Sequence, residues 1–180
     1  MPMKTAELVP VRPEANEYDP YYDRYISLVP GADIITTLRT QLDQTTAILS
    51  AVSEEKAGYR YAPGKWSVKE VLGHLTDTER IFAYRALRIA RNDRTPIEGF
   101  EQDDYVRFGP FSDCRLVDLV QEFGHVRRAS LSLLRNLDEN VWSRRGIANK
   151  SEISVRALAF ILAGHELHHR KVLKEKYGIA

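Results

Sequence analysis

The sequence predicts an all-α protein, a four-helix bundle with an irregular N-terminal arm. Four segments of about 20 to 25 residues carry apolar side chains at helical spacing, which is the pattern of such bundles. The chain between them shows no convincing strand, and no internal repeat is present. With 180 residues, 43% of them hydrophobic, the chain can bury one core without disulfides. We therefore expect an arm over residues 1–30 and one bundle domain over residues 31–177.

The arm and the first helix differ in their patterns. Residues 1–30 are rich in proline and tyrosine and have no sustained period, although one helical turn is expected near residues 22–28. Because tyrosine rings need a surface to lie on, the arm should wrap around the bundle. Apolar residues then recur at helical spacing from Ile34 to Val52, which predicts the first long helix over residues 31–53.

The second helix has the clearest start. Ser67 and Glu70 match a capping box, in which the N-cap hydroxyl and the carboxylate three residues later bind each other's backbone N–H groups. The helical pattern continues to about Arg91. Residues 92–110 then predict a connecting loop that is long enough to be functional.

The third and fourth helices are predicted over residues 112–137 and 154–177. Ser154 is a good N-cap for the fourth helix, and Gly178 is a good stop. An up-down-up-down order of the helices suits the short connections best, while the longer second and third connections leave room for a crossover.

The composition narrows the range of partners. The chain has 26 Lys and Arg against 25 Asp and Glu, which argues against nucleic acid, because phosphate binding needs a basic excess. No apolar run approaches the roughly 20 residues of a membrane span, and the N-terminus lacks a secretory signal pattern. The single cysteine, Cys114, cannot form an intramolecular disulfide. We therefore expect a cytoplasmic protein that binds neither nucleic acid nor membrane.

Three of the five histidines lie close together in the predicted fourth helix. His165 and His169 are four residues apart, so they share a face of the helix, and both fall in the middle of its apolar stripe. Buried imidazoles need partners, and a shared metal ion would satisfy both rings. His168 lies about 60° away, at the margin of the stripe, and is a poorer candidate for a ligand.

A metal ion needs a further ligand, and His74 in the second helix is the best candidate. It lies about 60° from the centre of the apolar face, close enough to reach a seam with another helix. His125 lies opposite the stripe of its helix and should be solvated. Gly73 and Gly164 each precede a candidate ligand, and close backbone approach around the ion would explain them. Three histidines would leave positions open for water or substrate, as in catalytic sites.

The segment from His165 to His169 also matches the zinc-protease pattern His-Glu-x-x-His, in which the glutamate is the general base. Only 11 of the 180 residues follow His169, and none of them is a histidine. We therefore disfavour a peptidase and keep Glu166, at the edge of the buried face, as a candidate catalytic base. Further candidates for a base or for a carboxylate that orients a ligand are Asp77, Glu79, Glu101, Asp103 and Asp104.

The stretch from Pro63 to Leu75, followed by His165-x-x-x-His169, resembles the DinB/YfiT-like superfamily of bacterial four-helix metalloproteins. The resemblance covers residues 31–177. It implies a divalent ion, zinc or nickel, held by His74, His165 and His169, often in a homodimer. Members of the family include thiol S-transferases that use bacillithiol or mycothiol, a mycothiol-dependent maleylpyruvate isomerase and proteins described as metal-dependent hydrolases.

Hypotheses from two functional classes follow. In the first, the protein is an enzyme whose ion lowers the pKa of a bound low-molecular-weight thiol or of water, as an S-transferase or a hydrolase of a small-molecule substrate. In the second, it is a non-catalytic stress protein that binds metal or a small molecule. An enzyme should hold its ion in an accessible pocket lined by residues 92–110 and the tyrosine-rich arm, whereas a structural ion should be fully ligated and buried. A plain bundle with core histidines would bind no metal.

Overall fold

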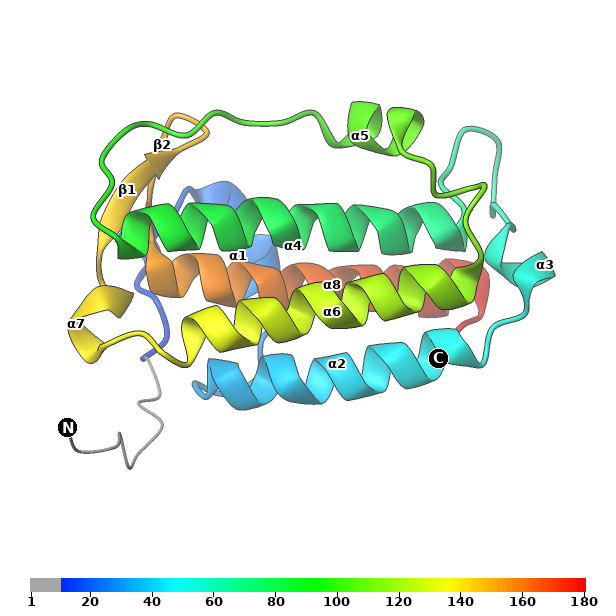
Figure 1. Cartoon of the computed structure of the whole chain (residues 1–180), viewed down its shortest axis with the longest axis horizontal. Coiled ribbons are helices and arrows are strands. Elements are labelled where there is room, and N and C mark those ends of the chain that lie inside the picture. Colours follow the sequence, from blue (N-terminus) through cyan, green and yellow to red (C-terminus); the bar gives the residue numbers. More distant parts are fainter. Residues whose placement is uncertain (1–10) are drawn as a thin grey trace.

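Four long helices form the body of the protein (Figure 1), and they confirm the predicted four-helix bundle. The computed structural model describes residues 11–180, so residues 1–10 of the expected arm lie outside the described part of the chain. Each long helix falls inside its predicted range. The four are α2 (Ile34–Ser50), α4 (Val68–Ala90), α6 (Leu116–Leu134) and α8 (Val155–Tyr177).

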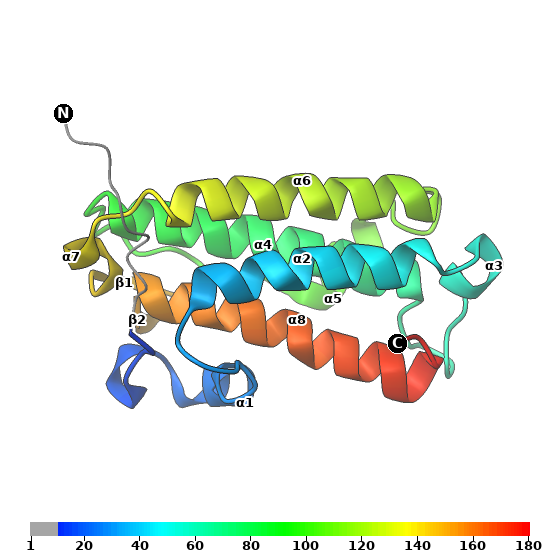
Figure 2. The same cartoon turned by 90° about the horizontal axis from the view of Figure 1, so that it is seen from below.

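The order of the helices around the bundle differs from the simplest expectation. Both α6 and α8 pack against α2 and α4, so α2 and α4 lie diagonally opposite each other. Figures 1 and 2 show that α4 and α6 run in one direction along the bundle, whereas α2 and α8 run in the other. The up-down-up-down order is therefore wrong. The observed order is up-down-down-up, and the second connection is the crossover for which the sequence left room.

The second connection runs back along the bundle from the end of α4 to its beginning (Figure 1). It contains the short helix α5 (Gln102–Phe108), so the prediction of a loop over residues 92–110 was incomplete. After α5, the Phe111 ring fills the space where a side chain on Gly73 would lie, with ring atoms 2.3 to 2.5 Å from that Cβ position. This contact brings the chain back to the first half of α4, so α6 starts there and runs parallel to α4.

A β-hairpin precedes α8, although the sequence showed no convincing strand. Its strands are β1 (Arg145–Ala148) and β2 (Ser151–Ser154), which pair antiparallel. The two turn residues, Asn149 and Lys150, have positive φ values of 49° and 67°, as a tight two-residue hairpin turn requires. The hairpin escaped prediction because each strand has only four residues and the turn carries lysine where glycine is usual.

The described part of the arm lies against α8 (Figure 2). Its helical turns are η1 (Ala15–Glu17), η2 (Pro20–Tyr22) and α1 (Asp23–Ile26). The buried carboxylate of Glu17 accepts hydrogen bonds from Ser154 Oγ and Arg156 Nε, each over 2.7 Å. An ion pair therefore ties the arm to the start of α8, in addition to the tyrosine contacts that the sequence suggested.

A buried ionic cluster joins the four long helices. Arg127 of α6 is 1% exposed, and its guanidinium lies 2.7 Å from Glu79 Oε1 of α4 and 2.7 Å from Glu166 Oε2 of α8. Arg127 also donates to the Leu38 carbonyl of α2 over 3.2 Å, and Thr45 of α2 donates its hydroxyl to Glu166. Burial alone would lower the pKa of Arg127, but the two carboxylates raise it above its ordinary value. We call Arg127, Glu79 and Glu166 the Arg127 cluster.

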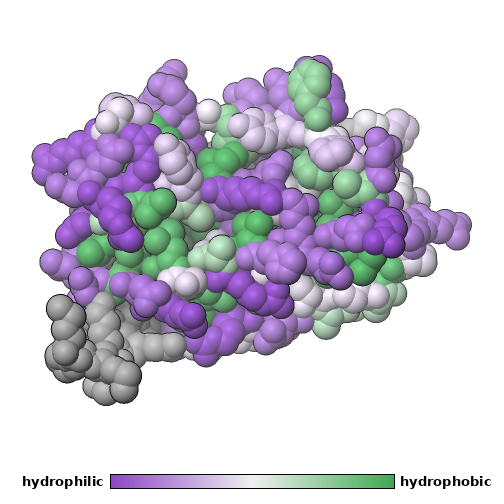
Figure 3. Space-filling model, viewed as in Figure 1, coloured by the Kyte–Doolittle hydropathy of each residue, from purple (hydrophilic) through white to green (hydrophobic). Residues whose placement is uncertain are grey.

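The exterior is mainly hydrophilic on the side that carries α4, α5 and α6. Figure 3 shows hydrophilic side chains over most of this face, with smaller hydrophobic patches between them. Tyr105 and Phe108 of α5 are among the exposed aromatic side chains. From residue 11 onward, no helix is both long enough and apolar enough to cross a membrane.

Candidate metal centre

Three imidazole rings meet where α4 and α8 pack together. His74 Nε2 of α4 lies 3.0 Å from His165 Nε2 of α8, and His169 Nε2 lies 3.1 Å from the same atom. One possible ligand atom from each ring lies within 4.8 Å of the other two. His74 and His165 are buried, and His169 is partly buried. The structure thus brings together the three histidines that the sequence singled out, and we call them the histidine cluster.

Helical geometry sets the positions of these rings. His165 and His169 are about one turn apart on α8 and project from the same face. The start of α4 is fixed by a capping box, since Glu70 N donates to Ser67 Oγ over 3.2 Å and Ser67 N donates to Glu70 Oε2 over 2.6 Å. His74 follows this start by about two turns and faces α8.

Burial favours the neutral form of the three rings. It lowers the pKa of His74 from an ordinary 6.5 to about 4. The pKa of His165 lies well below its ordinary value, first through burial and then through the neighbouring His169 and His74. Burial, followed by His74 and His168, also lowers the pKa of His169. At neutral pH the rings are therefore in the form in which histidine binds a metal.

The arrangement of the nitrogens fits a metal ion. In a neutral imidazole, each ring nitrogen either carries one hydrogen or offers one lone pair. His165 Nε2 therefore cannot form a full hydrogen bond with both His74 and His169. Metal–nitrogen bonds of about 2.0 to 2.1 Å place two nitrogens on one ion about 3.0 to 3.4 Å apart, close to the separations seen here. Three imidazoles suit zinc, nickel, copper or iron. They also leave further positions on the ion for other ligands.

Aromatic rings flank the histidine cluster on two sides. The centroid of the Trp66 ring lies 4.8 Å from that of His74 and 6.5 Å from that of His169, with the second pair stacked. The Tyr25 ring, which comes from the arm, stands edge-on to His165 with the centroids 5.3 Å apart. The arm is therefore part of the surroundings of the site.

Gly164 allows the arm to approach α8 this closely. A Cβ atom at Gly164 would lie 2.0 Å from the Tyr25 carbonyl oxygen, so any side chain would push the arm away. Gly73 makes room for the Phe111 ring in the same manner. The expected close backbone approach is therefore found at Gly164, beside His165, whereas Gly73 makes room for a side chain.

The other two histidines lie outside the cluster. His168 is half-buried, and its ring stands edge-on to Tyr25 at 5.5 Å and to His169 at 5.1 Å. Burial lowers the pKa of His168, and the positive charges of Arg24 and Lys171 lower it further. His125 is exposed on α6, as its position opposite the apolar stripe predicted.

Glu166, the candidate catalytic base, points away from the histidines. Successive residues of a helix are turned by about 100°, so Glu166 and the adjacent His165 face different neighbours. The carboxylate of Glu166 pairs with Arg127 and accepts a hydrogen bond from Thr45. Its surroundings are those of a structural ion pair, and we do not retain it as a base.

The carboxylates that were expected to orient the histidines also have other partners. Glu79 belongs to the Arg127 cluster, and Asp77 pairs with Arg80 over 3.2 Å. Burial raises the pKa of Asp77, while Arg80 opposes that effect. The Nδ1 atom of His74 instead faces Thr78 Oγ1 over 3.5 Å. A hydroxyl therefore stands where a carboxylate would commonly hold a metal-binding imidazole.

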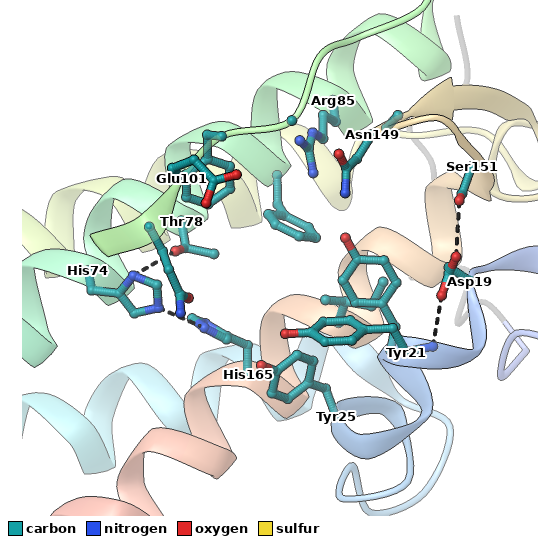
Figure 4. A pocket seen from close by; sticks show the side chains of 17 residues that line it. Asp19, Tyr21, Tyr25, His74, Thr78, Arg85, Glu101, Asn149, Ser151 and His165 are labelled. Carbon is teal, nitrogen blue, oxygen red and sulfur yellow. Dashed lines mark hydrogen bonds between the residues drawn. The ribbon is translucent and has the colours of Figure 1, made fainter. Parts of the chain in front are cut away.

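A cavity of about 470 Å³ opens beside the histidine cluster (Figure 4). His74 and His165 lie in its wall, so an ion held there would be accessible. The arm and residues 99–102 of the second connection line it, which is the lining expected of an accessible site, and the hairpin adds a third wall. The labelled lining residues in Figure 4 are Asp19, Tyr21, Tyr25, His74, Thr78, Arg85, Glu101, Asn149, Ser151 and His165.

Sequence reasoning missed two parts of this cavity. The hairpin turn reaches it through main-chain bonds to the second connection, since Asn149 N donates to Ile97 O over 2.8 Å and Ile97 N donates to Ile147 O over 3.0 Å. Arg85 of α4 is the other omission. It follows His74 by about three helical turns and therefore shares its face, a spacing that could have revealed it.

Comparison with known proteins gives one family and several similar proteins. The DinB superfamily model matches residues 37–173, which is most of the chain. The protein OB0413 of Oceanobacillus iheyensis, whose name places it provisionally among metal-dependent hydrolases, is 23% identical over 142 residues. That match covers 78% of this chain and 79% of the relative.

Solved structures support the same fold. YfiT from Bacillus subtilis, described as a probable metal-dependent hydrolase with an unusual four-helix bundle topology, gives a TM-score of 0.69 at 15% identity and covers 95% of each chain. The mycothiol-dependent maleylpyruvate isomerase gives a TM-score of 0.67 at 14% identity, over 86% of this chain and 63% of that one. The family match and the shared fold agree with the resemblance carried by the histidines and the start of α4. The chain belongs to the DinB superfamily.

Proposed function

We propose that the protein is a metal-dependent enzyme in which His74, His165 and His169 hold a divalent ion, zinc or nickel. The observation that carries the proposal is the convergence of three buried or partly buried Nε2 atoms at the wall of a cavity. A purely structural site would be closed to solvent by its own ligands. Here two of the three ligands line a space that can receive a small molecule.

The proposed chemistry follows from three neutral imidazoles that are partly enclosed by the protein. When bound, the ion supplies a Lewis acid that lowers the pKa of a thiol or water and so provides a nucleophile at neutral pH. Thr78 holds the His74 ring, while the Trp66 and Tyr25 rings shield the cluster from water on two sides. The cavity admits the small-molecule substrate from the remaining side.

The surroundings favour a low-molecular-weight thiol over water as the nucleophile. Activating water works best with a general base within hydrogen-bond reach. Among the described residues close in sequence to the ligands, Glu166 and Asp77 are engaged with arginines. A thiol bound to the ion would release its proton to solvent and would need no such base. Glu101, at the rim of the cavity, is the base that we propose if the reaction is a hydrolysis.

Metal content tests the proposal directly. We would measure it by mass spectrometry on untagged wild-type protein, on His165→Ala and on His125→Ala, whose exposed ring lies outside the site. The wild type and His125→Ala should carry close to one ion per chain, and His165→Ala should lose it because two ligands bind more weakly than three. Absence of an ion in the wild type, even after incubation with zinc or nickel, would contradict the proposal and leave a bundle with structural histidines.

Activity then separates the enzyme from its alternative. The metal-loaded protein would be assayed for transfer of bacillithiol or mycothiol to a thiol-reactive electrophile, and for hydrolysis of esters and amides. An ion without either activity would favour the non-catalytic metal-binding protein. We also propose a homodimer, as the family resemblance implies, which sedimentation analysis of the purified protein would test.

A further inference from the structure

Arg85 is a buried cation in the wall of the cavity. Its side chain is 2% exposed, and Figure 4 shows it beside Asn149, across the cavity from Tyr25 and away from His74 and His165. Its Nη2 atom donates to the Glu98 carbonyl over 3.0 Å, and the Tyr22 phenol lies beside it. No described carboxylate forms an ion pair with Arg85, and its Nε atom has no hydrogen-bond partner from residue 11 onward. Within residues 11–180, this side chain is therefore a buried charge without a counter-ion.

A buried charge without a counter-ion is costly unless something offsets it. The Phe82 ring centroid lies 5.0 Å from the guanidinium carbon and the Phe100 centroid 5.9 Å, so part of the compensation comes from cation–π contacts. The Arg127 cluster shows the usual solution, in which carboxylates surround the arginine. Arg85 has a cavity in that place.

The position of Arg85 relative to the histidines suits a ligand that spans both. Arg85 and His74 lie on the same face of α4, separated by about 16 Å of helix rise. Arginine side chains on a helix lean toward its N-terminus, which directs this one toward His74. A small organic molecule can therefore reach the metal ligands with one end and the guanidinium with the other.

We propose that Arg85 binds a carboxylate group of the substrate and so orients its reacting end toward the histidine cluster. The inference rests on the proposed function for its second half, while the carboxylate site itself does not need the ion. A guanidinium matches a carboxylate in planar shape and charge. One arginine between aromatic rings balances one negative charge, which favours a carboxylate over a doubly charged phosphate.

The acidic residues in the lining do not occupy this position. Asp19 accepts hydrogen bonds from Tyr21 N over 2.9 Å and from Ser151 Oγ over 3.1 Å, so it is held by the arm and the hairpin. Glu101 is exposed at the rim. Neither forms an ion pair with Arg85 within the described residues.

Calorimetry on the chelator-treated protein tests the carboxylate site without the metal. The probes are hexanoate, the uncharged hexanamide and inorganic phosphate. Hexanoate should bind wild type at least about tenfold more tightly than hexanamide, because a charge-assisted pair to a buried arginine is lost in the amide. Arg85→Gln should remove this preference, and Arg91→Gln, an exposed arginine at the end of the same helix, should keep it.

The possible outcomes are distinct. Equal affinity of wild type for hexanoate and hexanamide, or an unchanged preference in Arg85→Gln, would overturn the proposal, and tighter binding of phosphate would overturn the choice of carboxylate. If Arg85→Gln fails to fold, Arg85→Lys serves, with a preference reduced but retained. Metal content separates the two proposals: Arg85→Gln should keep the ion, and a wild-type protein that binds no ion should still prefer hexanoate to hexanamide if the carboxylate site is correct.

Discussion

Two buried polar clusters lie within the same bundle, and they differ in what completes them. In the Arg127 cluster, opposite charges from α4, α6 and α8 satisfy one another, with the Leu38 carbonyl and the Thr45 hydroxyl supplying further bonds. In the histidine cluster, three like groups with lowered pKa values face each other at a cavity. The first is held together by ion pairs and hydrogen bonds within the chain. In the second, the proposed ion would supply the partner that the three rings do not give one another.

The two clusters are close in sequence as well as in space. Glu166 belongs to one and His165 to the other, so adjacent residues of α8 serve different purposes. The rotation of about 100° per residue explains this, because it sends the two side chains to different neighbouring helices. Mutations can therefore test the clusters separately.

Breaking the Arg127 cluster should have the largest effect. Arg127→Met removes the cation that both buried carboxylates face, and we expect a loss of about 3 to 5 kcal/mol in the free energy of unfolding. In metal-free protein, His165→Ala should lower the free energy of unfolding by only about 1 to 2 kcal/mol. It removes one of three neutral rings, each of which disfavours protonation of the others. Urea unfolding of the two variants measures the difference. Equal losses would contradict the distinction between the clusters.

Acid should act mainly on the histidine cluster. The pKa of His74 is about 4 in the folded protein and 6.5 ordinarily, so between these values the unfolded chain binds more protons. The stabilising contribution is complete above pH 6.5 and is lost as pH falls through about 4, amounting to about 3 kcal/mol for His74 alone. Urea midpoints of metal-free protein across this range should fall with pH. His74→Asn should flatten the slope, and a flat wild-type curve would argue against the assignment.

His168 offers the smallest and most discriminating change. It lies beside His169 and Tyr25 but outside the three converging nitrogens. His168→Ala should leave the metal content unchanged and alter the free energy of unfolding by about 0.5 kcal/mol or less. The same mass spectrometry and urea unfolding measure both. Loss of the ion would mean that His168 is itself a ligand and belongs to the histidine cluster.

Much of the fold could be predicted because the helices follow from local sequence patterns. The apolar periodicity and the capping box at Ser67 and Glu70 locate the helices, and the same periodicity turns His165 and His169 inward. The crossover could not be predicted in this way. It depends on the contact between Phe111 and Gly73, which are far apart in the sequence and show no shared pattern.

The convergence of the three histidines could be predicted, whereas most of their surroundings could not. Periodicity placed Glu166 at the edge of the buried face, but it could not show that Arg127, on another helix, would occupy its carboxylate. The wall formed by Asn149 escaped for a different reason, because a hairpin of four-residue strands carries little signal. A partner on another element is a tertiary fact, and a single sequence reveals it only through rare spacings such as that of Arg85 and His74.

The walls of the cavity have one further consequence. The histidine nitrogens project from two long helices, whereas the arm, the second connection and the hairpin form the other walls. Hydrogen bonds between Asp19 and Ser151 and between Ile97 and Asn149 join these three segments to each other. The histidines and these walls of the cavity thus belong to different parts of the chain. Altering one connecting segment would therefore change which molecules enter the cavity, while the three histidines keep their positions on the two helices.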